Sequence, residues 1–198
     1  MGRQFTQFKA LTKIWILCPE GDEIKDRYQK QTMVYEGSED DVLSRYVAVA
    51  NMEKADYIVR VTGDCVELPS FMISRAIKAT VKKQTDYTTN VIYRTSMEGF
   101  DVEVLSKRLL DWLDEHAEGE DREHVTTLIR KGVENNFEDF PFKKGNKPSI
   151  CHIIDAYDLS FVKTSVDTEE DRKKTEVRKK RMSDKIEAAN RNGVALTP

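Results

Sequence analysis

The chain has 198 residues, of which 39% are hydrophobic and 34% are charged, and its formal net charge is −3. These values suit one domain around one hydrophobic core, and the slightly acidic balance argues against a general nucleic-acid or membrane-surface binder. Because the three cysteines show no CxxC spacing and no apolar run reaches membrane-spanning length, we expect a soluble cytoplasmic protein with reduced thiols.

The N-terminal third is predicted to alternate strands and helices. A strand at residues 14–17 precedes a short polar helix at 22–29 and a second strand at 32–35. Ser38 and Asp41 resemble a capping box, which predicts that a helix opens at Ser38. Its apolar face is expected to hold Val42, Tyr46, Val49 and Ala50. The apolar run at residues 57–61 predicts the next buried strand.

The middle of the chain continues this alternation. Pro69 and Ser70 introduce a predicted helix that runs to about Lys83. Its inward side chains are expected to be Phe71, Ile73, Ile77 and Val81. A short strand is predicted at 86–90, and a strand with one buried face at 100–105, where apolar and acidic residues alternate. Helices are predicted at 107–116 and 121–131.

The C-terminal third completes the predicted sheet. Residues 135–147 indicate a loop, and strands are expected at 150–154 and 161–166. A charged helix follows from Thr168, and its interleaved acids and lysines are typical of a solvated face rather than a basic patch. Together these elements predict an α/β fold with a mostly parallel sheet flanked by helices, in a single domain over residues 1–189 with a flexible tail at 190–198.

Two of the predicted strands are followed by an aspartate. Asp64 lies in a Thr-Gly-Asp turn after the strand at 57–61, and Asp167 follows the strand at 161–166. Ligands of open α/β sheets bind at the carboxyl ends of the strands. Two carboxylates there repel each other unless a cation lies between them, and Mg²⁺ is commonly held by carboxylates and substrate phosphates. The pair therefore indicates metal-assisted nucleotide chemistry, with an ordinary turn at Asp64 and a helix cap at Thr168 as the simpler alternatives.

Other polar residues give weaker signals. His124 lies four residues after Glu120 and next to Glu123, but no HExxH or Cys/His spacing accompanies them. A helix N-terminus with a polar side chain facing a cleft is the favoured interpretation. Cys65 directly follows Asp64 and has no histidine nearby in the sequence, so a packing role is favoured over a nucleophile. The sequence contains no glycine-rich phosphate loop of the GxGxxG or GxxxxGKS type.

Five segments in this order carry a resemblance to a known family. They are EGSEDDVLSRY (36–46), ADYIVRVTGDCVEL (55–68), EGFDVEVLS (98–106), DREHVT (121–126) and DLSFVKTSVDTEED (158–171). As a set they resemble the cytidylyltransferase-like family of spore coat polysaccharide biosynthesis proteins, which is related to the acylneuraminate and 3-deoxy-manno-octulosonate cytidylyltransferases. The resemblance runs from about residue 14 to residue 171.

The resemblance implies a Rossmann-like nucleotide-diphospho-sugar transferase fold and a specific activity. A hydroxyl of a sugar or sugar acid would attack the α-phosphorus of a nucleoside triphosphate, with CTP favoured, and pyrophosphate would leave. Asp64 and Asp167 match the residues that hold the divalent cation, Mg²⁺ being the expected ion. Four further residues match motifs that line the sugar side of the cleft: Asp101, Glu103, Glu123 and His124. The relatives are frequently homodimers, so a homodimer is expected.

The resemblance also leaves part of the family pattern unmatched. Family members begin with a strand and a Gly/Arg/Lys loop that wraps the triphosphate, whereas residues 1–17 best match the end of the first helix and the second strand. An N-terminally truncated fold is therefore expected. Three functions remain open: a nucleotidyltransferase for glycan assembly, a non-catalytic sugar- or partner-binding homologue, and a glycosyltransferase of related fold. The last ranks lowest because Gly63, Asp64 and Cys65 stand where a DxD motif is wanted.

Overall fold

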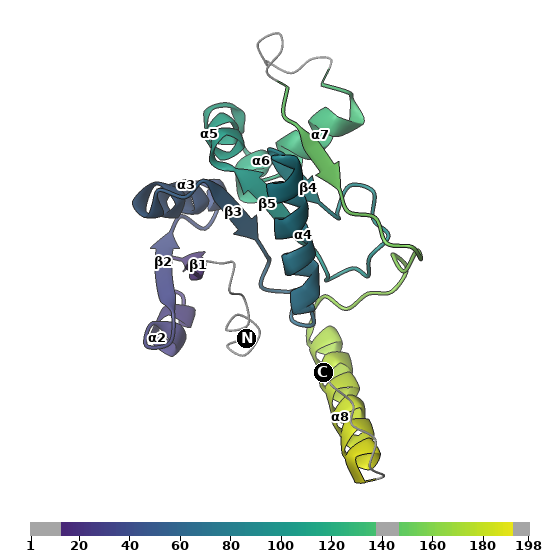
Figure 1. The fold of residues 1–198 in the computed structure, drawn as a ribbon. Coiled ribbons are helices and arrows are strands. Elements are labelled where there is room, and N and C mark those ends of the chain that lie inside the picture. The colour runs from purple at the N-terminus through teal and green to yellow at the C-terminus, as the bar shows by residue number, and fades with distance from the viewer. Residues whose placement is uncertain (1–12, 138–146, 192–198) are drawn as a thin grey trace.

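The computed structural model describes residues 13–137 and 147–191, with side chains as far as Asp184. The strands are β1 (Trp15–Pro19), β2 (Met33–Gly37), β3 (Tyr57–Arg60), β4 (Tyr87–Thr89), β5 (Glu103–Ser106) and β6 (Ile150–His152). The helices are α2 (Ile24–Tyr28), α3 (Val42–Glu53), α4 (Ser70–Lys83), α5 (Lys107–His116), α6 (Glu120–Glu123), α7 (Thr127–Glu134) and α8 (Glu169–Arg191). Helix α8 extends away from the rest of the chain (Figure 1).

The described strands form two sheets. β1 and β2 make a parallel pair, and the larger sheet has the order β3-β5-β4-β6. Both β3 and β4 are antiparallel to β5, and β4 is parallel to β6, so β5 alone runs against the other three strands of this sheet. Helices flank the sheets (Figure 1), and the predicted α/β class is confirmed.

Strand β5 lies in the centre of the larger sheet and contributes to two hydrophobic clusters. Leu105 packs in the cluster that includes α3 and α5, whereas Val104 packs in the cluster that includes α4. All residues of β5 are buried, including Glu103 at 1% exposure. The prediction of a strand with one buried face is therefore wrong. The alternating acidic residues suggested a face exposed to solvent. Glu103 can nevertheless be buried because Arg60 and Arg130 neutralise its charge.

The start of one predicted helix and the buried face of another differ from the structure. Helix α3 is capped by Asp41, which accepts a hydrogen bond from the Ser44 N–H, so the helix begins later than the predicted Ser38. In α4, Phe71 and Val81 are 61% and 65% exposed. The buried side of α4 consists of Met72, Ile73, Ala76 and Thr80. Ile73 was predicted correctly, whereas Ala76 and Thr80 were missed because they are small or polar; the Thr80 hydroxyl donates to the Ala76 carbonyl inside the protein.

Three other expectations are revised in the C-terminal half. The predicted strand at 161–166 is not a strand, because it makes a single isolated bridge, Glu98 to Lys163, and Phe161 is 80% exposed. The predicted helix at 121–131 is divided into α6 and α7 around Val125, whose φ is +60°. Most of the predicted loop at 135–147 lies outside the described residues. Helix α8 continues to Arg191, and the rest of the predicted tail, residues 192–198, also lies outside them.

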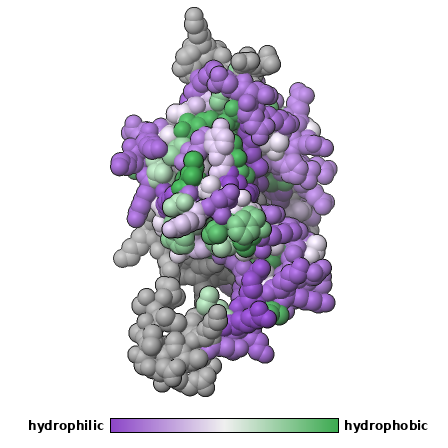
Figure 2. Space-filling view, turned by 90° about the vertical axis from the view of Figure 1, so that its right-hand side faces the viewer, coloured by the Kyte–Doolittle hydropathy of each residue, from purple (hydrophilic) through white to green (hydrophobic). Residues whose placement is uncertain are grey.

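The surface is hydrophilic over most of the face drawn in Figure 2, with hydrophobic side chains gathered near its middle. Large exposed hydrophobic side chains of the described residues include Tyr93, Ile154, Tyr157 and Phe161, in the loops after β4 and β6. None of the described helices is long and apolar enough to cross a membrane. The homodimer remains a prediction.

Candidate functional site

Residues 162–166 run between two loops that carry the predicted site. The Val166 N–H donates to the Asp64 carbonyl oxygen at 3.0 Å. On the other side, the Thr164 N–H donates to the Glu98 carbonyl at 2.7 Å, and the Glu98 N–H donates to the Val162 carbonyl at 2.9 Å. Asp167 therefore follows directly after a residue that is hydrogen-bonded to the Asp64 backbone, although the segment that ends at Asp167 is not a regular strand.

The two aspartates differ in their surroundings. The Asp64 carboxylate is half-buried and forms no hydrogen bond or ion pair with any described residue. Asp167 is exposed, accepts a hydrogen bond from the Ser165 hydroxyl at 3.2 Å and forms an ion pair with Lys163 at 2.7 Å. The hydrogen bond to Asp167 raises the pKa of Lys163. Lys163 thus neutralises Asp167, whereas no described residue neutralises the Asp64 carboxylate.

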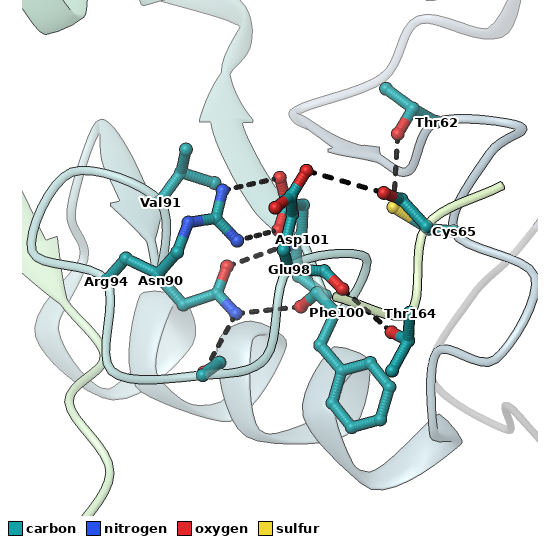
Figure 3. Close-up of polar contacts among 12 residues, drawn as sticks. Thr62, Cys65, Asn90, Val91, Arg94, Glu98, Phe100, Asp101 and Thr164 are labelled. Atoms are coloured by element: carbon teal, nitrogen blue, oxygen red, sulfur yellow. Dashed lines mark hydrogen bonds and ion pairs between the residues drawn. The ribbon is translucent and has the colours of Figure 1, made fainter. Parts of the chain in front are cut away.

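Asp101 is held by an arginine, and the residues on either side of it are held by a buried amide (Figure 3). The Arg94 guanidinium binds both Asp101 oxygens, at 2.5 and 2.8 Å, and this hydrogen bonding raises the pKa of Arg94. The fully buried Asn90 amide donates to the Phe100 carbonyl at 2.8 Å and accepts from the Val102 N–H at 2.9 Å. Asn90 therefore fixes the backbone on both sides of Asp101. Sequence reasoning missed both Asn90 and Arg94.

The carboxylates present are compatible with one hard divalent cation. The described residues contain no group of three or more His, Cys, Asp or Glu side chains that could hold a metal ion. Mg²⁺ keeps several waters and is usually bound by one or two carboxylates together with substrate phosphates, so it needs no such group. Asp64, with no internal partner, is the better of the two predicted ligands. Asp167 would have to exchange its bond to Lys163 for the cation.

The other predicted site residues lie in different surroundings. Glu103 is buried and accepts hydrogen bonds from Arg60, at 2.5 Å, and from Tyr87. Glu123 and His124 are exposed at the end of α6. Within the described residues no hydrogen bond or ion pair links these three to Asp64, Asp101 or Asp167, and their contacts to a sugar remain predictions.

Gly99 allows residues 162–166 to approach the site. Its φ is +94°, and a Cβ there would lie 2.4 Å from the Ser165 nitrogen and 2.8 Å from the Thr164 carbonyl carbon. We expect Gly99→Ala to lower the free energy of unfolding by about 1–3 kcal/mol or more and to expose residues 162–166 to hydrogen exchange. Denaturant unfolding with exchange mass spectrometry measures both effects.

Gly63 provides the matched control because a Cβ there meets no atom within 4 Å and its φ is not positive. Gly63→Ala is expected to change the unfolding free energy by less than about 0.5 kcal/mol. Equal destabilisation by both alanines would contradict the role assigned to Gly99.

Cys65 is buried between the two acidic loops, and burial raises the pKa of its thiol from the ordinary 9.0 to about 11. The charges of Asp64 and Asp101 add to this rise, and the hydrogen bond with Thr62, at 3.2 Å, opposes it. The folded state therefore holds the proton more tightly. This contribution to stability is complete below about pH 9 and is lost as the pH rises toward 11.

The thiol therefore predicts a pH-dependent difference between two proteins. The unfolding free energy of the wild type relative to Cys65→Ala should fall by about 2 kcal/mol between about pH 8 and about pH 11. Denaturant titrations across this range measure the difference, in which the other titrating groups cancel. A difference that stays constant with pH would show that the thiol is not desolvated.

Comparison with known proteins identifies the fold. No protein-family model matches the chain. A stretch of 98 residues, 48% of the chain, is 36% identical to an uncharacterized protein of Methanocaldococcus jannaschii, and it spans only 39% of that protein's length. A solved cytidylyltransferase from Leptospira borgpetersenii is similar with a TM-score of 0.75 and 24% identity, over 87% of this chain and 70% of that one.

A second solved structure has a similar fold. It is CMP:2-keto-3-deoxy-manno-octonic acid synthetase in complex with CTP, with a TM-score of 0.60 and 10% identity, over 90% of this chain and 85% of that one. At these identities the likeness establishes a shared fold, and the predicted nucleotidyltransferase-like architecture is confirmed to that extent.

Proposed function

We propose that this chain carries the acidic site of a cytidylyltransferase-type enzyme, which transfers a nucleotidyl group from CTP to a sugar or sugar acid for glycan assembly. The observation that carries the proposal is the backbone hydrogen bond from Val166 to Asp64, because Val166 directly precedes Asp167, the second predicted metal-binding aspartate. The fold shared with a cytidylyltransferase and with a CTP-bound synthetase supports it. So does the sequence resemblance, which assigns the same two aspartates to the metal.

In this proposal each residue of the site has a physical task. Asp64 and Asp167 hold a divalent cation, which when bound offsets negative charge on the phosphates and on the departing pyrophosphate. Arg94 and Asn90 keep Asp101 fixed at the sugar side. The sugar hydroxyl oxygen forms the new bond to the α-phosphorus as the bond to pyrophosphate breaks, and the hydroxyl proton is released to solvent. Catalysis then depends mainly on positioning and on charge neutralisation.

The test is incubation of the protein with CTP, Mg²⁺ and a panel of sugars and sugar acids, with pyrophosphate release and Mg²⁺-dependent CTP binding as the readouts. Acceptor-dependent release of pyrophosphate supports the transferase. Mg²⁺-dependent binding of CTP without release favours the non-catalytic homologue, for which the lack of a glycine-rich phosphate loop in these 198 residues is the specific observation. Absence of both binding and release overturns the proposal.

A further inference from the structure

Three buried or partly buried arginines outnumber the carboxylate that pairs with them. We call Arg45, Arg60 and Arg130 the arginine group. Arg60 binds Glu103 at 2.5 Å, and the Arg130 Nε lies 3.6 Å from the same carboxylate. Arg45 forms no ion pair with any described residue. In the described part of the chain, Glu103 is thus the single carboxylate that pairs with any of these three guanidinium groups, and it pairs with two of them, which leaves an excess of positive charge.

Arg45 is the clearest case of an unsatisfied cation. Only 6% of this residue is exposed, and its Nε is buried without a hydrogen-bond partner. Its aliphatic stem lies over Gly37, where an added Cβ would meet the Arg45 Cγ at 2.8 Å. Burial of a guanidinium without a counter-ion is strongly unfavourable, so Arg45 is available for a partner that the described residues do not provide.

Arg45 and Arg60 belong to different elements, α3 and β3, and the charges of both act on Tyr46. Burial raises the pKa of Tyr46, and the positive charges of Arg60 and Arg45 both act against this rise. The Arg60 Nε, like the Arg45 Nε, is buried without a hydrogen-bond partner. Each of these two arginines therefore has one unsatisfied donor in the described part of the chain.

The surroundings of Arg45 coincide with the end of the β1–β2 pair. Burial raises the pKa of Cys18, near the end of β1, and Arg45 is among the nearby charges that act on this thiol. Asp22 and Glu36 also act on it, but neither forms an ion pair with Arg45, and Glu36 is bound to Lys25. Gly37, under the Arg45 stem, is the last residue of β2. The carboxyl ends of parallel strands are where α/β sheets bind ligands.

We propose that Arg45 forms an oxyanion site that takes a phosphate group of the nucleotide. The inference rests on the proposed function and deepens it, because the acidic edge around Asp64 cannot hold the negative charge of a triphosphate by itself. A guanidinium is the side chain best suited to this task, since its planar fork pairs with two phosphate oxygens. Such a ligand would satisfy the orphaned donors and neutralise the excess charge of the arginine group.

The experiment compares the wild type with Arg45→Met in thermal unfolding, in the absence of Mg²⁺, with inorganic pyrophosphate, inorganic phosphate or succinate as the probe. Pyrophosphate should raise the Tm of the wild type. In Arg45→Met it should bind at least about tenfold more weakly, because a bidentate charged hydrogen bond is lost. Without ligand, the Tm of Arg45→Met should equal or exceed that of the wild type, because an unpaired buried charge has been removed.

Two further variants complete the design. Arg45→Lys keeps the charge but loses the fork, so it should retain only part of the pyrophosphate effect. Arg172→Met removes an exposed arginine that pairs with Glu169 and Glu176 on α8, and it should respond to pyrophosphate like the wild type.

Several results would overturn the site. The first is that pyrophosphate does not raise the Tm of the wild type. The second is that Arg45→Met has a lowered Tm without ligand and keeps the pyrophosphate response of the wild type. The third is that succinate raises the Tm as much as pyrophosphate does. The transferase is judged separately. Pyrophosphate binding that depends on Arg45, without pyrophosphate release from CTP, keeps the site and removes the transferase. Equal turnover of CTP by the wild type and Arg45→Met keeps the transferase and removes the site.

Discussion

Asp64→Asn is expected to lower the rate of pyrophosphate release from CTP by roughly 10²–10³-fold, the loss typical when one charge-stabilising group of an active site is removed. The Asp64 carboxylate has no hydrogen-bond or ion-pair partner among the described residues. The substitution should therefore leave the free energy of unfolding within about 0.5 kcal/mol of the wild type. Steady-state rates across a Mg²⁺ titration, with Mg²⁺-dependent CTP affinity as a second readout, measure the effect.

The companion substitution separates a metal ligand from a general charge effect. Asp167→Asn removes a carboxylate that is paired with Lys163, and it should depress turnover strongly as well. Asp184→Asn changes the charge equally at an exposed position of α8 and should have no effect. Full activity in Asp64→Asn or in Asp167→Asn would remove that residue from the proposed metal site.

The order of strands and helices could be predicted because each element carries its own local pattern. The helix at 107–116 was predicted with the observed bounds of α5. In the structure, Ser106 caps this helix and its leucines are buried on one face. Asp64 could be selected because an apolar strand that ends in Gly-Asp is visible in the sequence. Such signals lie within a few neighbouring residues.

What the sequence did not reveal depends on contacts between distant residues. The position of Asn90 as the support of Asp101 requires that residues 90 and 100–102 lie side by side, which no local pattern encodes. The segment at 161–166 resembles a strand because of its apolar and β-branched residues. It is held instead by backbone hydrogen bonds to Glu98 and Asp64, with Gly99 permitting the approach. An asparagine directly after a short strand and a glycine before an acidic motif are the signals that could have been used.

Glu103→Ala is expected to lower the free energy of unfolding by about 3–5 kcal/mol, because it leaves buried cations without their counter-ion. Burial raises the pKa of Tyr87 far above its ordinary value, so its hydroxyl stays protonated and donates to Glu103. The substitution would leave that hydroxyl and Arg60 without an acceptor. Urea unfolding measures the loss, and Glu134→Ala, at an exposed position of α7, is the control with the same change of residue.

Glu103→Gln separates the charge of this network from its packing and tests the arginine group at the same time. The amide fills the same space and can still accept one hydrogen bond, so the free energy of unfolding should fall less than it does for alanine. None of the three guanidinium groups then has a carboxylate that pairs with it in the described part of the chain. If these arginines attract an oxyanion, pyrophosphate should raise the Tm of Glu103→Gln by more degrees than it raises that of the wild type. An equal rise of the Tm in both proteins would mean that the charge of Glu103 does not affect the binding of the anion.

For Glu103→Ala, a fall in the free energy of unfolding below about 1 kcal/mol would mean that the buried ion pair contributes no more than an exposed one.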